Sequence, residues 1–362
     1  MSESDTPTFK DDYVKSSCLS KLFLNWSISI MSYINKHKSL DDASQCPKMP
    51  EEVNSEHVVT KMEQALDEMV KKNPDFDYKN QMLYLLLRTF KWQISTVVFW
   101  GLMAELVAIT NLFFSSFFVK WLEEDGDEWA GYLYALGFVC LVYISQLFRV
   151  QYFFGANALG INVRKAASGI MYKKSLRLSQ KSKAVSSTGK IVTIVSSELQ
   201  TLDWGIQFSA FIIIGPISST YGFCLIAINF QEGAAIGFLV FILMVVVQVL
   251  LSKCSLKWKR KEGAYSDKRI DVLGDSVNGI RTIKTYGWES PFEKLVKKFR
   301  NLQLKMIFNS HVINSIGHGI FQNGGFLIAI FIFSYHYLMD REFSYSRSLS
   351  TIGILGYLSQ FG

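Results

Sequence analysis

The residues that could do chemistry in this sequence are a few polar and ionisable side chains inside long apolar runs. They are Glu105, Arg149, His318, Gln322 and Asn323. Ionisable groups in a membrane-spanning helix are costly unless they face the interior of a helix bundle or a water-filled path. His318 and Gln322 stand one helical turn apart, which predicts a polar face on a substrate pathway. For each residue an alternative stays open: a structural hydrogen bond or ion pair between helices, for instance between Glu105 and Arg149.

The sequence contains no motif for catalysis, nucleotide binding or metal binding. A phosphate-binding loop of the form GxxxxGK[ST] occurs nowhere in the 362 residues, so nothing in this chain is expected to cradle ATP. The five cysteines lack CxxC spacing, which argues against a metal site or a disulfide framework. We therefore expect no catalytic residue, no metal and no cofactor bound by this chain itself.

The composition is typical of a membrane protein with sizeable polar parts. Hydrophobic residues make up 49% of the sequence, aromatic residues 14%, and the mean hydropathy is +0.17, a combination more apolar than that of an ordinary soluble protein. The net charge of +7 comes from basic residues that lie between apolar runs. This distribution predicts a membrane topology rather than nucleic-acid binding.

Five apolar runs are long enough to cross a bilayer, and a sixth is shorter. A hydrocarbon core about 30 Å thick needs about 20 mostly apolar helical residues. The runs lie near residues 94–122, 132–154, 208–228, 234–251, 316–338 and 349–362. Since the last run has about half to two-thirds of the required length, we expect either a chain that continues past Gly362 or an incomplete final helix.

Charges in the connecting segments predict the orientation. Acidic residues fill 123–128, whereas segments 164–190 and 253–305 are rich in Lys and Arg. Because Lys and Arg are retained on the cytoplasmic side, both basic segments and the amino terminus are predicted to be cytosolic. The chain is therefore expected to be an integral multi-pass protein of the plasma membrane or of a vacuolar or other internal membrane.

Helical periodicity continues through both basic segments. Apolar residues recur at helical spacing over 163–178, 270–280 and 292–306. A continuous helix over 132–179 would be roughly 70 Å long, so two hairpins with long cytosolic arms are predicted. Small polar residues at 183–189 predict the first turn. Ser290, Pro291 and Glu293 predict that a helix restarts at Pro291 after the second turn.

Residues 1–90 are expected to form a polar cytosolic linker, separate from a transmembrane domain over 91–362. Residues 19–34 are amphipathic and are expected to lie along the inner membrane interface; the alternative is a helix packed on the protein. A charged helix over 51–73 is expected to be a solvated linker, with Val58, Met62, Leu66 and Met69 on one face.

Four segments of the sequence carry a family pattern. Gly279-Ile-Arg-Thr-Ile-Lys-Thr-Tyr-Gly-Trp-Glu289 looks like a GI(K/R)-x-(I/L)-K-x-Y-x-W-E signature, and Thr188-Gly-Lys-Ile-Val192 looks like a TGEIVN segment. Residues 129–134, and 22–26 with 40–42, are similar to an external loop and an amino-terminal linker. Together, from Leu19 to the end, the chain resembles the multidrug-resistance-associated (C) branch of ATP-binding-cassette (ABC) exporters.

The resemblance implies an all-α membrane protein: an ABC exporter-type six-helix transmembrane domain with long cytosolic helical extensions and an incomplete sixth span. It also implies that the extensions end in short coupling helices near 187–193 and 282–289, which dock on nucleotide-binding domains. The coupling residues implied are Thr188, Gly189, Lys190, Thr285, Tyr286, Trp288 and Glu289. The alternative for Tyr286 and Trp288 is that they only cap their own hairpin.

The function implied is ATP-driven export of amphipathic or conjugated small molecules, with ATP and Mg held by a nucleotide-binding domain outside this chain. The implied partners are the lipid bilayer, that domain, a second transmembrane domain in cis or in trans, and a small-molecule substrate. Gly101 and Ala104 stand where anion carriers of this branch place basic residues, which argues against glutathione-type conjugates. Two alternatives stay open: a non-catalytic half that binds or regulates a full transporter, and an ATP-independent carrier or channel.

Overall fold

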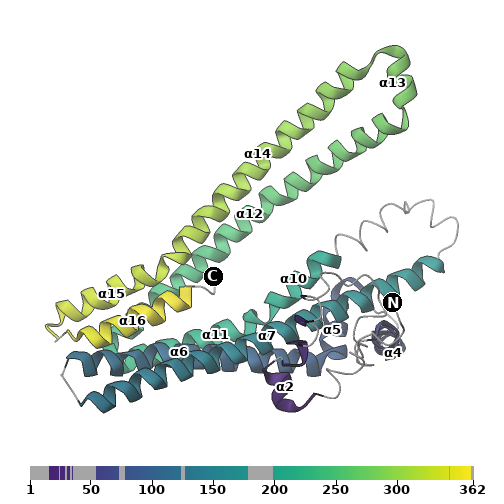
Figure 1. Cartoon of the computed structure of the whole chain (residues 1–362). Helices are drawn as coiled ribbons and strands as arrows, with labels where there is room; N and C mark the ends of the chain where they lie inside the picture. The colour runs from purple at the N-terminus through teal and green to yellow at the C-terminus, as the bar shows by residue number, and fades with distance from the viewer. Residues whose placement is uncertain are drawn as a thin grey trace. The chain divides into compact units, whose positions relative to one another are not determined.

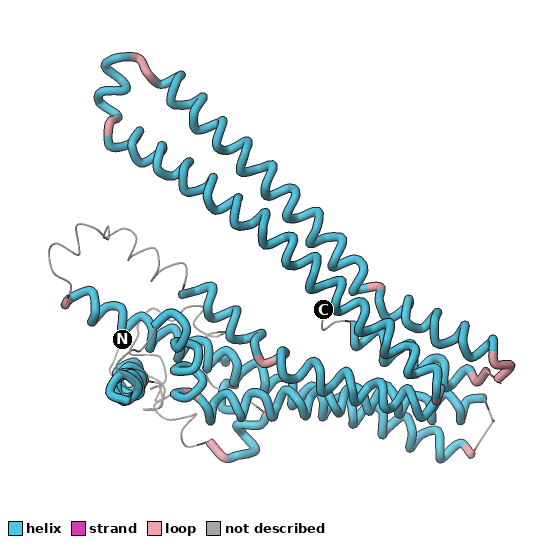
Figure 2. Tube along the Cα trace, turned by 180° about the vertical axis from the view of Figure 1, so that it is seen from behind, coloured by secondary structure: helices cyan, strands magenta, loops and turns pink. Residues whose placement is uncertain are grey.

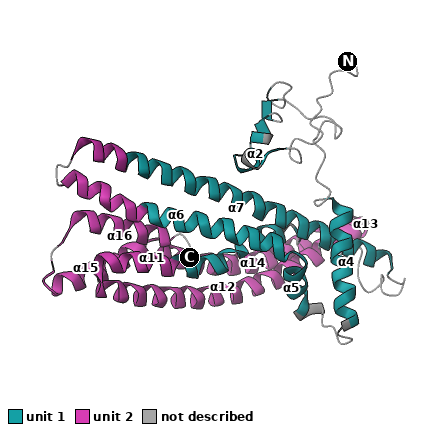
Figure 3. Cartoon of the chain, turned by 90° about the horizontal axis from the view of Figure 1, so that it is seen from below, with its two compact units in different colours: residues 1–111, 135–218 teal, residues 112–134, 219–362 magenta. Residues whose placement is uncertain are grey.

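The computed structural model describes residues 16–23, 25–28, 31–32, 35, 54–72, 78–123, 127–177, 199–341 and 343–359. Within these ranges the chain is helical, with short turns and no strand, as expected for an all-α protein. It divides into two compact units, residues 1–111 with 135–218 and residues 112–134 with 219–362 (Figure 3). Unit 1 contains residues from both sides of the domain boundary that was predicted at residue 90.

Four of the described helices are long and apolar enough to cross a membrane. They are α6 (Lys91–Glu123), α7 (Glu128–Leu176), the segment Thr201–Phe230 and α12 (Glu232–Asn278). A fifth crossing is formed if α14 (Glu289–Gln322) and α15 (Gly324–Leu338), which meet at a bend of 42°, count as one span. The sixth predicted run overlaps α16 (Tyr345–Leu358), which has 14 residues. The helical, multi-pass fold class predicted from the sequence is confirmed.

Unit 1 contains a packed helix where the sequence predicted a solvated one. Helix α4 (Ser55–Lys72) precedes α5 (Tyr78–Thr89), and Val58, Met62 and Met69 of α4 are buried in the core of the unit. Val59 lies so close to Gly169 of α7 that a Cβ there would stand 2.3 Å from the valine side chain. The prediction of a solvated linker over 51–73 is wrong in this respect, because the apolar stripe packs in a core with Leu85 of α5 and residues of α7, and α4 lies against α7 at Gly169.

The amphipathic stretch near the amino terminus is held against α7. It contains α2 (Cys18–Leu22) and a 3-10 turn, η2 (Asn25–Ser27). The side-chain Nε2 of Gln151 donates hydrogen bonds to the backbone oxygens of Lys21 (3.1 Å) and Leu22 (2.7 Å). These carbonyls end a helix and lack partners within it, so the contact favours packing on the protein. Residues 24, 29–30 and 33–34 of this stretch lie outside the described residues.

Unit 2 is dominated by a long hairpin. Helices α12 and α14, of 47 and 34 residues, run side by side and are joined by α13 (Ile280–Tyr286) at the tip (Figures 1 and 2). The hydroxyl oxygens of Ser255 and Ser310 lie 3.0 Å apart. A Cβ on Gly317 would stand 2.8 Å from Oε1 of Gln248. A step of seven residues forward along α12 thus corresponds to a step of seven residues backward along α14. The two helices therefore form an antiparallel pair in constant register, packed through small residues.

The predicted run 316–338 is broken at Asn323. The Nδ2 atom of this residue donates a hydrogen bond to the backbone oxygen of Gly319 (2.9 Å), and α15 starts at the next residue. A Cβ on Gly325 would lie 2.7 Å from the backbone oxygen of Leu355. Glycine therefore lets α15 approach the backbone of α16, and the bend has an identifiable cause.

The predicted run 208–228 lies within the span Thr201–Phe230. In this span a turn at Ala210 separates α10 (Leu199–Ser209) from α11 (Phe211–Phe230), and Pro216 lies inside α11. Proline lacks the N–H that would bond to the carbonyl four residues earlier, so this stretch of backbone is less uniformly bonded than the apolar sequence indicates. On the far part of α11, Nδ2 of Asn229 donates to Oγ of Ser350 at 3.2 Å and ties the helix to α16.

Candidate functional site

The tip of the α12–α14 hairpin is shaped by one glycine. Gly287 has φ 64° and ψ 35°, a left-handed conformation that side chains resist and glycine adopts freely. The N–H of Trp288 donates to the backbone oxygen of Ile283 at 2.9 Å, a bond typical of this type of helix end. The chain then enters α14 at once, so the helix begins at Glu289.

The predicted restart at Pro291 is therefore wrong by two residues. Trp288 takes the N-cap position, and no side chain caps the helix. Pro291 lies in the first turn of α14, where its missing N–H has no intrahelical acceptor to lose. Glu293 pairs with Lys297 on the next turn instead of reaching back toward Ser290. The reason is that the glycine turn already directs the chain into helix, which leaves no extended cap residue.

Tyr286 and Trp288 form an exposed aromatic pair at this tip. Their ring centroids are 5.1 Å apart with an interplanar angle of 24°. The side chains are nevertheless 65% and 49% exposed. Stacking thus joins the two rings into one apolar platform without burying it, whereas Ile283 of α13 is buried. A platform of this kind is typical of a surface that a partner covers.

The charges beside the platform are paired. Nζ of Lys284 lies 3.1 Å from Oε1 of Glu289. The pKa of Glu289 is lowered, first by a hydrogen bond from its own backbone N–H and then by Lys284, so this carboxylate stays ionised at neutral pH. The hydroxyl of Thr285 donates a hydrogen bond to the backbone oxygen of Arg281 at 2.8 Å, so the hydrogen of this hydroxyl is bonded within α13. Thr188, Gly189 and Lys190, the other predicted coupling residues, lie outside the described residues.

Glu105 and Arg149, predicted as pathway residues or as an ion pair, are brought together in unit 1. Oε1 of Glu105 on α6 lies 3.5 Å from Nη2 of Arg149 on α7, and the glutamate side chain is only 7% exposed. This contact is the ion pair between helices that the sequence analysis gave as the alternative to a pathway role. A role for the pair in transport stays a prediction.

His318 and Gln322 of α14 line a hollow in unit 2. The hollow has a volume of about 380 Å³ and is also lined by Phe326 of α15 and by Gly356 and Ser359 at the end of α16. Both predicted residues are exposed to it, one helical turn apart on the same face. Asn323, predicted with them, is absent from this lining and closes the end of α14 instead.

A second polar hollow shares His318. It has a volume of about 220 Å³, and its polar lining includes Gln248 and Ser252 of α12 and Asn314 of α14. These residues and Ser359 were not predicted as site residues from the sequence. The signal that could have found one of them is spacing, because Asn314, His318 and Gln322 follow each other at intervals of four.

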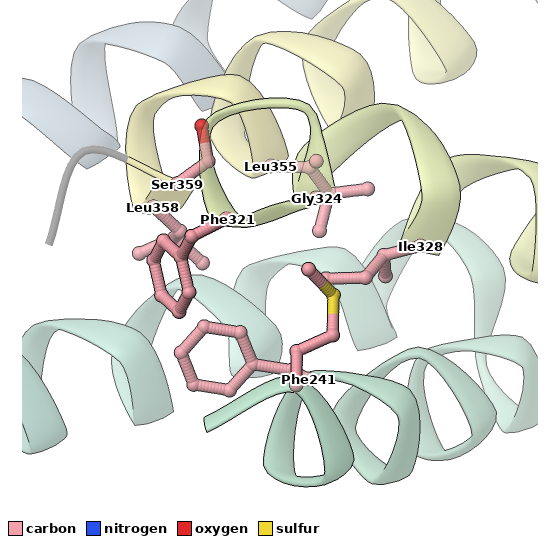
Figure 4. Close-up of a pocket in the computed structure, with 9 residues that line it drawn as sticks. Phe241, Phe321, Gly324, Ile328, Leu355, Leu358 and Ser359 are labelled. Carbon is pink, nitrogen blue, oxygen red and sulfur yellow. The ribbon is translucent and has the colours of Figure 1, made fainter. Parts of the chain in front are cut away.

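The apolar neighbour of these hollows is closely packed. Phe241 of α12 and Phe321 of α14 meet edge to face with centroids 6.3 Å apart, beside Ile328, Leu355 and Leu358 (Figure 4). The space left between them is about 10 Å³, roughly the room that one water molecule needs. Of these three neighbouring spaces, only the two that share His318 have ligand-sized volume, and their amides, imidazole and hydroxyl can hydrogen-bond a bound molecule.

The described residues thus supply apolar spans, polar hollows beside them and a hairpin with an exposed aromatic tip, and no group of metal-ligating side chains. Comparison with protein families matches residues 95–360 to the ABC transporter transmembrane region. The matched range contains the pair Glu105–Arg149, the hollow around His318 and the tip at Gly287. The chain is therefore a member of the ABC transporter transmembrane family.

Proposed function

We propose that this chain is the transmembrane domain of an ATP-driven exporter of the multidrug-resistance-associated branch. The observation that carries the proposal is the stacked, exposed pair Tyr286–Trp288 at the end of a continuous helical hairpin. In this role the pair docks on a nucleotide-binding domain that holds ATP and Mg outside this chain. The tip then receives the movement of that domain, and the spans respond by changing their arrangement.

The hairpin is built to transmit a displacement. Helix α14 is continuous from Glu289 to Gln322, so about 45 Å of helix separates the tip from His318 at 1.5 Å per residue. Contacts at Ser255–Ser310 and Gln248–Gly317 keep α12 in register beside it. A domain that pulls the tip would therefore shift the walls of both polar hollows together, which is the requirement for alternating access.

The polar hollows supply the substrate site of the proposal. His318 and Gln322 would hydrogen-bond the polar part of an amphipathic molecule, with Gln248, Asn314 and Ser359 adding amide and hydroxyl groups. None of the lining residues is a carboxylate or a lysine. This lining fits a substrate whose head group is uncharged and hydrogen-bonding better than a multiply charged conjugate.

The test is ATP-dependent transport by the chain assembled with its nucleotide-binding domain. Reading the transcript across the codon for Gly362 shows whether that domain follows in the same chain or must be co-expressed. In the assembled protein in sealed vesicles, Y286A/W288A is expected to lower ATP-dependent transport at least tenfold, as loss of an interfacial aromatic anchor does. Expression and helical content should stay unchanged, because both rings are exposed.

A matched control is the aromatic pair Trp129 and Tyr132 near the start of α7, also exposed, with ring centroids 6.3 Å apart. W129A/Y132A should leave the coupling of ATP hydrolysis to transport intact. Equal loss in both variants, or full activity of Y286A/W288A, would contradict docking at the tip. Transport by this chain alone without ATP would support a carrier or channel instead.

A further inference from the structure

One face of α12 carries an exposed apolar stripe. Its residues are Leu239, Leu243, Val246 and Leu250, with exposed fractions between 49% and 68%. They follow each other at intervals of four, three and four, which places them on one side of the helix. The opposite side, with Gln248 and Ser255, faces α14. Contacts between membrane helices favour small residues, so the branched side chains of this stripe indicate contact with lipid.

The same face changes from apolar to basic after Leu250. The next residues in the series are Lys253, Lys257 and Arg260, at intervals of three, four and three, and all are exposed. Five of the nine residues 253–261 are basic, and no acid occurs between Glu232 and Glu262. Within the part of the chain that the structure describes, none of the five forms an ion pair with a carboxylate.

The change falls at the depth where a bilayer changes from hydrocarbon to head group. From Glu232 to Leu251, α12 rises about 30 Å, the thickness of a hydrocarbon core. Trp258 lies within the basic stretch, and Nζ of Lys261 stands 5.0 Å from its ring centroid. Tryptophan is enriched at membrane–water interfaces. By the register of Ser255 with Ser310, the level of Arg260 corresponds to Lys305 of α14, which adds a further cation.

We propose that the stripe Lys253–Lys257–Arg260 binds the phosphate head groups of anionic phospholipids in the adjoining leaflet. The occupant is the lipid surface, because the apolar stripe that leads into these residues is itself lipid-facing in character. The stripe lies on the face of α12 opposite Gln248, so it is separate from the polar hollows. The proposal therefore does not depend on ATP or on a transported substrate.

Spin-label electron paramagnetic resonance on the reconstituted chain tests the proposal. The chain is placed in phosphatidylcholine vesicles with trace spin-labelled phosphatidylserine or spin-labelled phosphatidylcholine. The wild type is expected to retain the anionic label severalfold more strongly, and the preference should fall as salt is added. K253Q/K257Q/R260Q is expected to remove this severalfold preference, because basic residues near the surface attract anionic lipid.

The control variant K268Q/K294Q/K298Q removes the same charge from the same hairpin. Lys268 lies about 27 Å beyond Leu250 along α12, several screening lengths away at physiological salt. This variant should keep the preference for phosphatidylserine. A wild type without preference, an unchanged preference in K253Q/K257Q/R260Q, or an equal loss in the control would overturn the proposal. The last result would show that net charge, and not this stripe, attracts the lipid.

Discussion

The carboxylate of Glu105 and the guanidinium of Arg149 occupy a place where a lone charge would be unstable. Both lie on apolar helices, and the glutamate is almost fully covered. Taking an ion out of water costs several kcal/mol unless a partner compensates it. Each charge therefore offsets the desolvation cost of the other, and the pair fixes how α6 and α7 face each other in unit 1.

We predict that E105L destabilises the protein by about 3 kcal/mol, because it leaves a partly buried cation without its anion. The double variant E105L/R149L should recover most of that loss, since both charges leave together. Unfolding by denaturant in detergent, followed by circular dichroism, measures the two differences. Changing Glu68 to Gln in the exposed pair Arg88–Glu68 is the control, expected to cost less than about 1 kcal/mol. A double variant as unstable as E105L would contradict this account.

The sequence was enough to place Glu105 and Arg149 in spans. It did not show whether the two residues line a substrate pathway or form an ion pair between helices. That distinction depends on the rotation of α6 against α7, which no local pattern encodes. Asn323 shows the same limit: its polarity suggested a pathway role, which stays a prediction, and the sequence did not indicate the hydrogen bond that its side chain donates to the backbone oxygen of Gly319. The shared face of His318 and Gln322 could be predicted, because the spacing of four defines it whatever the neighbours are; their role in transport stays a prediction.

Contacts between helices in unit 2 depend on where side chains are missing. At Gly325, α15 approaches the backbone of α16, and a methyl group there would lie 2.7 Å from the oxygen of Leu355. Backbone atoms cannot rotate aside as a flexible side chain does. The contact is therefore intolerant of even one added carbon.

We predict that G325A destabilises the protein by about 2 kcal/mol, in the range typical of overpacked contacts. G319A is the matched control on α14, because nothing lies within 4 Å of a Cβ built there. Alanine also favours helix over glycine, so G319A should be neutral or slightly stabilising. Thermal unfolding in detergent compares the two variants. Equal midpoints would show that α15 and α16 do not approach as closely as described.

Helix lengths were the most predictable feature of the fold, and helix ends the least. The apolar runs and the periodic arms predicted α6, α7 and α12 within a few residues. The turn at Ala210 was missed because the apolar sequence continues across it. The break at Asn323 was missed, although Gln322-Asn-Gly-Gly325 interrupts the apolar sequence, because the run 316–338 is long enough for one span. The start of α14 was misplaced because Ser290 and Pro291 look like a cap, while the left-handed Gly287 had already set the direction. These errors are local, so they leave the order of helices unchanged.

At the scale of the whole molecule, one orientation satisfies several independent features. Lys and Arg concentrate in the α12–α14 hairpin, acidic residues fill the segment before α7, and the aromatic pair at the hairpin tip is exposed. Positive residues stay on the cytoplasmic side, and ATP-binding partners are available there. The basic stripe of α12 would then face the cytoplasmic leaflet, which carries the anionic lipid.

We therefore predict that the hairpin tip is cytosolic and the start of α7 lies on the opposite side. With the five native cysteines replaced, E128C should react with a membrane-impermeant maleimide that is added on the side of the membrane facing away from the cytosol. For a protein of the plasma membrane this side is the outside of the intact cell. S290C should react only from the cytosolic side, that is, after permeabilisation of an intact cell. Complete labelling of both variants in detergent controls for buried thiols. The reverse pattern would put the aromatic tip where no ATP-binding partner can reach it, and would remove the basis for an ATP-driven exporter while leaving the family membership intact.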